Sequence, residues 1–175
     1  MTGWQGFSCC ALYAGVLGIV SFFAGRLLAR CAFHPERFPW RAYAWEDGLW
    51  KRLRIRRWQA RVPDMSRLFT KLMPAKRLTK QTAADLPRMI AETCVAELTH
   101  TVLSFLGLAM PFLWRGAGGW IAAAVYIVFG NLTFILVQRY NRPRLLRLYQ
   151  RRARRGARST DHADFDIELQ HRRGT

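Results

Sequence analysis

Three long apolar segments constrain the fold of this chain more than any other feature. They are FSCCALYAGVLGIVSFFAG (residues 7–25), LTHTVLSFLGLAMPFLW (98–114) and WIAAAVYIVFGNLTFILV (120–137), and none contains an Asp, Glu, Lys or Arg residue. A helix needs roughly 20 residues to span a membrane, with a lower limit near 17. The sequence therefore predicts an all-α integral membrane protein with about three transmembrane helices. A soluble bundle with two buried helices is the alternative.

The basic residues are distributed unevenly around these segments. Of the 28 Lys and Arg residues, none precedes the first segment, 16 lie between the first and second, one lies between the second and third, and 11 follow the third. Lys and Arg accumulate on the cytoplasmic side of membrane proteins. We therefore expect a multi-pass protein of the cytoplasmic (inner) membrane, with its N-terminus outside and its C-terminus in the cytoplasm. The net charge of +17 then reflects topology and contact with anionic membrane lipids, and no nucleic-acid partner is expected.

These patterns divide the chain into four parts. Residues 1–30 are predicted to form an N-terminal transmembrane helix, and residues 31–85 a cytoplasmic basic and aromatic interfacial segment with a short amphipathic helix around 46–58. Tryptophan and arginine alternate there, and both are side chains that settle at headgroup depth. Residues 86–152 are predicted to hold two transmembrane helices and an elbow with the sequence QRYNRPRL. Residues 153–175 are predicted to form a disordered basic tail.

The second apolar segment belongs to a longer predicted helix over residues 86–113. Asp85 can cap its start, and Pro87 is tolerated in a first turn, whereas Pro111 should bend or end it. At 1.5 Å per residue this helix is roughly 42 Å long, which exceeds the ~30 Å hydrocarbon core of a membrane. Its first turns are therefore expected to project into the cytoplasmic interface.

Three ionisable side chains share one face of this helix where it enters the lipid: Glu92, Glu97 and His100. Ionisable groups at that depth are costly and favour a functional interpretation. A carboxylate beside an imidazole fixes its tautomer and raises its basicity. We expect His100 to be a general base oriented by Glu97, with Glu92 bonded to the substrate. In the alternative, both glutamates merely pair with cytoplasmic arginines.

A metal site is the rival interpretation of the same three residues. The Glu-x-x-His pair of Glu97 and His100 resembles half of a di-iron site, but no second such pair lies in or next to the three apolar segments. A single magnesium ion on two carboxylates is the other metal candidate. We assign no metal ligand.

The end of the third apolar segment carries a second polar cluster. The residue before a proline avoids the α conformation, so Pro143 predicts a helix break near Asn141–Arg142. This break would form the elbow at cytoplasmic headgroup depth. Arginine binds phosphates and carboxylates through two parallel hydrogen bonds. The alternative is a stop-transfer cluster of positive charge. The expected substrate-binding residues are Asn131, Gln138, Arg139, Tyr140, Asn141 and Arg142.

Three stretches resemble one known family. VQRYNRPRL (137–145) preceded by Asn131, ETCVAELTH (92–100) and RRWQARVPD (56–64) are similar, in this order, to signatures of the glycosyl-4,4'-diaponeurosporenoate acyltransferase family. The resemblance implies transfer of a fatty acyl chain to a sugar hydroxyl of a glycosylated carotenoid. Its third stretch adds Trp58 and Asp64 to the expected substrate-binding residues.

The resulting hypothesis is a membrane O-acyltransferase that acts on a glycolipid or a glycosylated carotenoid. No bound cofactor is expected, and acyl-CoA or a similar activated acyl donor would be the co-substrate. The expected partners are membrane lipids and the glycosylated acceptor, with a partner membrane enzyme as a further candidate. Two alternatives stay open: a non-enzymatic membrane subunit that binds lipid or a partner protein, and a metal-dependent lipid-modifying enzyme.

Overall fold

The computed structural model describes residues 3–28, 33–59 and 85–173, with side chains as far as Arg155. Within these residues all regular secondary structure is helical. The predicted substrate-binding residue Asp64 lies outside them. The helices follow one another as α1 (Gly3–Leu27), α2 (Glu46–Leu53), α3 (Ile55–Trp58), α5 (Leu86–Gly107), α6 (Met110–Leu113), α7 (Ala117–Val125), η4 (Tyr126–Leu132) and α8 (Thr133–Arg173).

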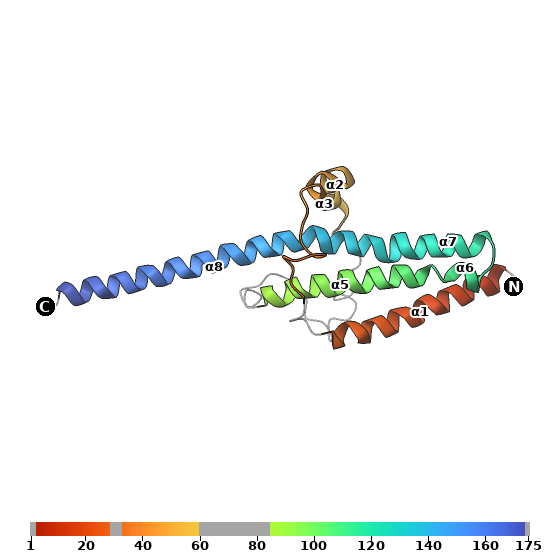
Figure 1. The fold of residues 1–175 in the computed structure, drawn as a ribbon, viewed down its shortest axis with the longest axis horizontal. Coiled ribbons are helices and arrows are strands. Elements are labelled where there is room, and N and C mark those ends of the chain that lie inside the picture. Colours follow the sequence, from red (N-terminus) through yellow and green to blue (C-terminus); the bar gives the residue numbers. More distant parts are fainter. Residues whose placement is uncertain (1–2, 29–32, 60–84, 174–175) are drawn as a thin grey trace.

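Three helical stretches of the described residues are long and apolar enough to cross a membrane, as the apolar segments predict. They are Gly3–Leu27, Leu86–Leu113 and Ala117–Arg155. The three run side by side, and α8 continues past the end of the others (Figure 1). Large apolar side chains are exposed along them, among them Ile19, Phe23, Phe105 and Trp120. Such a surface suits the acyl chains of a bilayer, which are as apolar as leucine.

The second stretch is interrupted near its end, as Pro111 predicts. Helix α5 ends at Gly107, and α6 starts at Met110 with the proline in its first turn. Proline lacks the N–H that would bond to the carbonyl four residues earlier, and for Pro111 that carbonyl belongs to Gly107. At the other end, the side chain of Asp85 makes no capping hydrogen bond.

A tight turn joins α6 to α7 at the end of the bundle that lies near the N-terminus of α1 (Figure 1). Gly116 adopts a φ of 104°, which residues with a side chain rarely adopt. The ring of Trp114 lies against Gly6 of α1 and Gly118 of α7, where an added Cβ would overlap it. These glycines let α1 and α7 approach the same indole.

The third span corrects the predicted elbow. Helices α7, η4 and α8 follow each other without interruption, and Pro143 lies inside α8. The neighbouring side chains explain why the helix continues, because Arg142 is held by α5 and Tyr140 packs against Trp50 and Ile55. Tertiary contacts of this kind outweigh a local preference. The tail also differs from prediction, since α8 reaches Arg173 where residues 153–175 were expected to be disordered.

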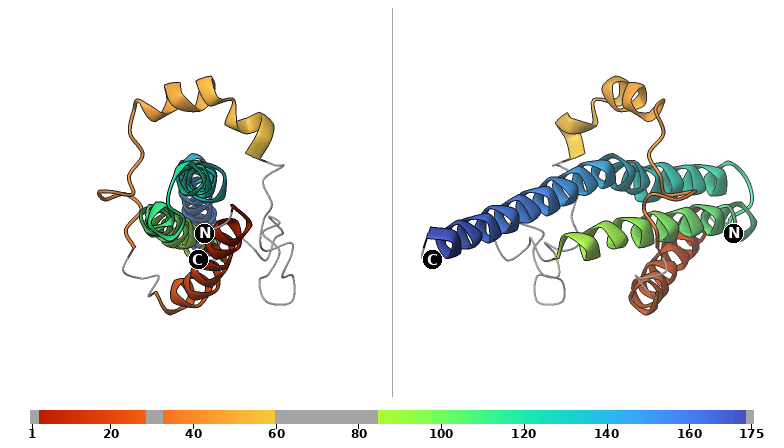
Figure 2. Two further views of the ribbon diagram at one scale, coloured as in Figure 1. Left: turned by 90° about the vertical axis from the view of Figure 1, so that its right-hand side faces the viewer. Right: turned by 60° about the vertical axis from the view of Figure 1, so that its left-hand side comes forward.

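The interfacial segment contains the short helix expected around residues 46–58, divided into α2 and α3. Between them Arg54 takes a left-handed conformation with φ 49°. The inner faces of the two helices pack Trp50 and Ile55 against Tyr140 of α8. Both helices therefore lie on the side of α8 that is turned away from α1 (Figure 2).

Candidate active site

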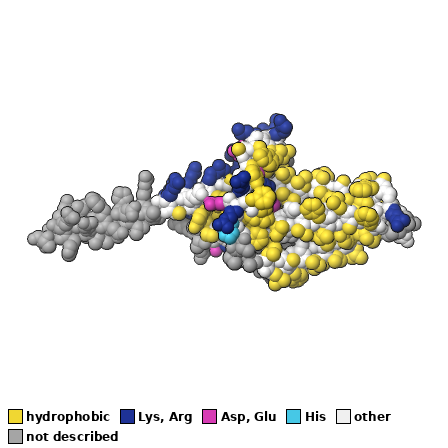
Figure 3. All heavy atoms as spheres, viewed as in Figure 1, with side chains coloured by type: hydrophobic (Ala, Val, Ile, Leu, Met, Phe, Trp, Pro, Cys, Tyr) yellow, Lys and Arg dark blue, Asp and Glu magenta, His cyan; other side chains and the backbone are white. Residues whose placement is uncertain are grey.

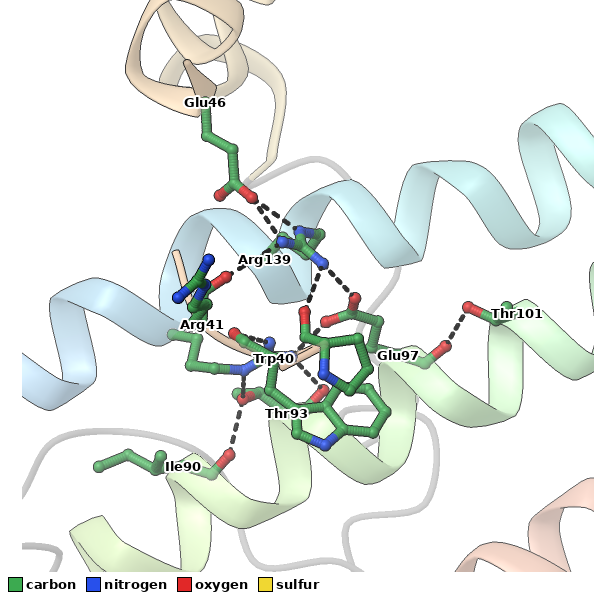
Figure 4. A network of polar contacts seen from close by, with 10 residues as sticks. Trp40, Arg41, Glu46, Ile90, Thr93, Glu97, Thr101 and Arg139 are labelled. Atoms are coloured by element: carbon green, nitrogen blue, oxygen red, sulfur yellow. Dashed lines mark hydrogen bonds and ion pairs between the residues drawn. The ribbon is translucent and has the colours of Figure 1, made fainter. Parts of the chain in front are cut away.

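Polar and charged side chains from α2, α5 and α8 meet beside the irregular segment that precedes α2 (Figure 4). Glu97 of α5 is at the centre, and it is only 6% exposed. Its Oε1 accepts a hydrogen bond from Arg139 Nη1 at 2.7 Å, and its Oε2 accepts one from Arg142 Nη2 at 2.5 Å. One carboxylate thus bridges two arginines of α8.

Arg142 makes hydrogen bonds to several groups in this network. It is 2% exposed, and its Nε donates to Thr93 Oγ1 at 2.8 Å. Its Nη1 donates to the carbonyl of Trp40 at 2.8 Å, and its Nη2 also donates to the carbonyl of Thr93 at 3.0 Å. Every nitrogen of the guanidinium has a protein partner, and the predicted role of Arg142 in binding substrate stays a prediction.

Arg139 joins the interfacial segment to the bundle. Its Nε donates to Glu46 Oε1 at 3.1 Å, and its Nη2 donates to the same oxygen. Further bonds reach the carbonyls of Pro39 and Arg41, at 3.4 and 3.3 Å. Glu46, in the first turn of α2, is 2% exposed. This arginine therefore also has a set of protein partners, and its expected contact with a substrate phosphate or headgroup stays a prediction.

Together, Glu46, Glu97, Arg139 and Arg142 form a network of two negative and two positive charges. Buried charges need partners, and removing one member of a buried pair typically costs about 3–5 kcal/mol. Because the four residues come from α2, α5 and α8, we infer that the network fixes these helices relative to one another.

His100 has a different partner from the one predicted. Its Nδ1 lies 3.0 Å from Asn131 Oδ1, whereas both carboxylate oxygens of Glu97 bond to arginines. The expected Glu97–His100 pair is thus not formed. The imidazole also stacks on Phe134, with ring centroids 4.8 Å apart and planes within 8°.

The hydrogen bonds of Asn131 determine the His100 tautomer. Its Nδ2 donates to the carbonyl of Tyr126 at 3.0 Å, and the side chain is buried. The amide is therefore oriented with its oxygen toward the imidazole, an assignment that follows from the network. Since an oxygen can only accept, His100 Nδ1 must carry the proton. In the neutral ring Nε2 is then the basic nitrogen.

The π-helix η4 explains how Asn131 reaches this position. Such wider turns are rare and occur frequently at functional sites. Within it, the Asn131 side chain bonds back five residues to the carbonyl of Tyr126, and at the start of α8 Thr133 Oγ1 bonds back five residues to the carbonyl of Val128 at 2.9 Å. These side-chain bonds support the wide turn and direct the amide toward α5.

The remaining predicted site residues fall into two groups. Glu92 forms an ion pair with Arg88 at 3.2 Å, as the alternative interpretation expected. Trp58 Nε1 donates to the carbonyl of Leu53 and so braces α3 against α2. Tyr140 is buried, and Arg144 lies over its ring at 3.3 Å. The contacts of these three side chains are structural. They do not direct a free polar group toward His100.

Gln138 and Asn141 are the predicted residues that the network does not use. Gln138 lies roughly two turns after Asn131 on the same face of the third span, and it is half-buried, as is Asn141. Within the described residues, no hydrogen bond reaches either side chain. Gln138 thus lies on the same face of the third span as Asn131, about 10 Å further along the helix axis, with an amide group that a substrate could bind.

Sequence reasoning missed Glu46, Thr93 and Phe134. The sequence position of Thr93 could have indicated its role, because Thr93 lies four residues before Glu97 and shares its helix face. Phe134 follows Asn131 by three residues and so shares a face with it. Glu46 had no such signal, since it reaches the site only through the fold of the interfacial segment. In the ranges that the structure describes, no three His, Cys, Asp or Glu residues gather into a group that could hold a metal ion.

Comparison with known proteins gives a consistent result. The family model described as glycosyl-4,4'-diaponeurosporenoate acyltransferase matches residues 32–151. A relative of this name from Staphylococcus haemolyticus is 32% identical over 122 residues, which cover 67% of this chain and 69% of the relative. Another, from Staphylococcus aureus strain N315, is 30% identical over 107 residues, which cover 59% of this chain and 62% of the relative. No solved structure matches. The matched range contains the charged network and the His100–Asn131 pair.

Proposed function

Because the chain belongs to the glycosyl-4,4'-diaponeurosporenoate acyltransferase family, we propose that it transfers a fatty acyl group to a sugar hydroxyl of a glycosylated carotenoid or a related glycolipid. The names of its relatives specify both the acyl transfer and the glycosylated acceptor. Family membership favours this enzymatic function over a non-enzymatic membrane subunit. An acyl-CoA or a similar thioester is the proposed donor.

The observation that carries the chemistry is the His100–Asn131 pair. With Nδ1–H held by the Asn131 oxygen at 3.0 Å, His100 presents Nε2 as a base. General-base catalysis by a positioned side chain typically contributes ~10²–10⁴ in rate. Stacking on Phe134 fixes the ring plane, so that the direction of the Nε2 lone pair is set before a substrate arrives.

The proposed reaction needs one proton to move twice. Nε2 of His100 takes the proton of the sugar hydroxyl while the hydroxyl oxygen forms a bond to the acyl carbonyl carbon. The carbon–sulfur bond of the donor then breaks, and Nε2 returns the proton to the departing thiolate. The products are the sugar ester and the free thiol. Asn131 keeps accepting from Nδ1 throughout, including in the imidazolium state.

The depth of His100 suits substrates of mixed polarity. His100 lies three residues beyond Glu97 on α5, about 4.5 Å further along the helix axis. It is therefore next to the charged network, on the side of the apolar segment of α5. A glycolipid headgroup and a donor thioester can meet there while both acyl chains stay in the leaflet. Gln138 is proposed to bind the sugar or the acyl carbonyl, and Asn141 to assist from one turn further along α8.

Reconstituted transfer tests the function directly. The purified full chain would be placed in liposomes with glycosyl-4,4'-diaponeurosporenoate and a radiolabelled fatty acyl-CoA, with EDTA present. The proposal predicts a labelled product whose mass equals that of the acceptor plus the fatty acid minus water. Absence of this ester from protein that retains its helical content would reject the proposed donor and acceptor. Ester formation only after a divalent metal is restored would favour the metal-dependent alternative.

A further inference from the structure

The outward surface of α2 and α3 is strongly cationic. Five basic side chains are exposed there, and within the described residues none of them forms an ion pair. Dark-blue side chains gather over these helices, close to the limit of the apolar part of the bundle (Figure 3). We name this set the α2–α3 basic surface; it consists of Lys51, Arg52, Arg54, Arg56 and Arg57.

Two contacts hold this surface at a fixed level along the bundle. On the inner face, Trp50 and Ile55 pack against Tyr140 of α8. At the start of α2, the buried Glu46 pairs with Arg139. Both α8 residues follow directly on the apolar segment that ends at Val137. The α2–α3 basic surface is therefore anchored where the third span leaves the apolar region.

Exposed aromatic side chains accompany the cations. Phe38 is 79% exposed and Trp45 is 64% exposed, and both belong to the segment that the network holds against α8. Aromatic residues of this kind settle at the boundary between acyl chains and headgroups. A surface that combines them with five exposed cations is complementary to an anionic lipid surface.

We propose that the α2–α3 basic surface binds the headgroups of anionic phospholipids in the leaflet that surrounds the third span. This lipid-binding site is separate from acyl transfer and does not rest on it. Helices α2 and α3 pack on α8 through Trp50 and Ile55, and the five cations are exposed on the outward side of these helices. This placement disfavours binding of the phosphates of an acyl donor at the reacting centre.

The test compares two triple variants of the full chain. Arg52→Gln/Arg56→Gln/Arg57→Gln removes three charges from the surface. Arg151→Gln/Arg154→Gln/Arg155→Gln removes the same number from exposed positions of α8. The control positions lie roughly 18–24 Å beyond Arg139 along the helix, more than twice the ~8 Å Debye length at physiological ionic strength. Circular dichroism would show that each variant keeps its helical content.

The readout is native mass spectrometry of the purified proteins with equal amounts of phosphatidylglycerol and phosphatidylcholine. A basic residue near an anionic surface contributes about fivefold to local partitioning. We expect the wild type and the α8 variant to retain phosphatidylglycerol preferentially, and the α2–α3 variant to lose that preference by about tenfold or more.

Three results would overturn the proposal. One is an equal preference of the wild type for both lipids, and another is an equal loss in both triple variants, which would assign the effect to diffuse net charge. The third is displacement of phosphatidylglycerol by free coenzyme A but not by chloride at the same ionic strength. That result would identify the α2–α3 basic surface as a site for soluble phosphates.

Discussion

Asn131 connects the backbone of the third span to the chemistry of His100. Its amide nitrogen donates a hydrogen bond to the Tyr126 carbonyl inside η4, so the amide oxygen is the atom that contacts the imidazole. A carboxylate in the same place would also orient the ring, but it would add a negative charge close to the apolar region, where charges are costly. The neutral amide fixes the tautomer without that cost.

The pairing of charged residues could be predicted only in part from the sequence. Helical spacing indicated that Glu97 and His100 share a face, but spacing does not decide which of several cations takes a carboxylate. Two arginines of α8 offer charge-assisted hydrogen bonds, which are roughly twice as strong as neutral ones. They bind Glu97, and Asn131 binds His100 instead.

Arg142→Lys should reduce stability rather than substrate binding. Lysine keeps the positive charge beside Glu97 but cannot supply the bonds that the guanidinium makes to Thr93 and the Trp40 carbonyl. Leaving a buried acceptor unsatisfied costs about 1–3 kcal/mol. The thermal unfolding midpoint in detergent should fall accordingly.

The exposed Arg147→Lys is the matched control for this measurement, and it should change stability by no more than about 0.5 kcal/mol. A large loss of acyl transfer by Arg142→Lys at an unchanged unfolding midpoint would instead restore the substrate-binding role that the sequence suggested.

At the scale of elements, the apolar segments determine most of the architecture. Length and hydropathy alone located all three candidate spans, and Pro111 correctly marked the end of α5. Pro143 did not end its helix, because contacts on both sides of α8 hold the chain helical there. The two prolines differ in their surroundings. The interruption before Pro111 leads into a turn, whereas Pro143 lies in a stretch of α8 whose residues pack against α2, α3 and α5.

Pro143→Ala should therefore stabilise the protein and leave acyl transfer unchanged. The alanine restores a hydrogen bond to the Arg139 carbonyl, and proline in a helix interior is about 3 kcal/mol less favourable than alanine. Pro87→Ala is the matched control, since Pro87 lies in the first turn of α5, where proline is tolerated. Thermal unfolding of both variants measures the effect. Loss of transfer by Pro143→Ala would indicate that a bend at this position is needed for activity.

The molecule has an apolar part that contains α1, α6 and α7 and a basic part that contains α2, α3 and the turns of α8 between Arg139 and Arg155 (Figure 3). The charged network and the His100–Asn131 pair lie at the junction of the two. This arrangement follows from the order of charges along the chain, so the sequence could predict it. The contact between α2 and α8 could not be predicted, because it depends on packing between residues about 90 positions apart.

The uneven distribution of basic residues predicts the orientation of the three spans. Reporter fusions within residues 60–84 and after Thr175 should report a cytoplasmic location, and a fusion at Gly116 should report an external one. The opposite pattern would place the network and His100 on the external side and would remove cytoplasmic acyl-CoA as the donor.

Single-turnover acyl transfer by the His100→Gln variant measures whether His100 is the general base that Asn131 orients. Glutamine preserves size and polarity but offers no basic nitrogen. We expect a rate at least ~10²-fold below wild type, an intermediate rate for Asn131→Leu, and a wild-type rate for His34→Gln, whose side chain is exposed. A wild-type rate for His100→Gln in correctly inserted protein would contradict this role.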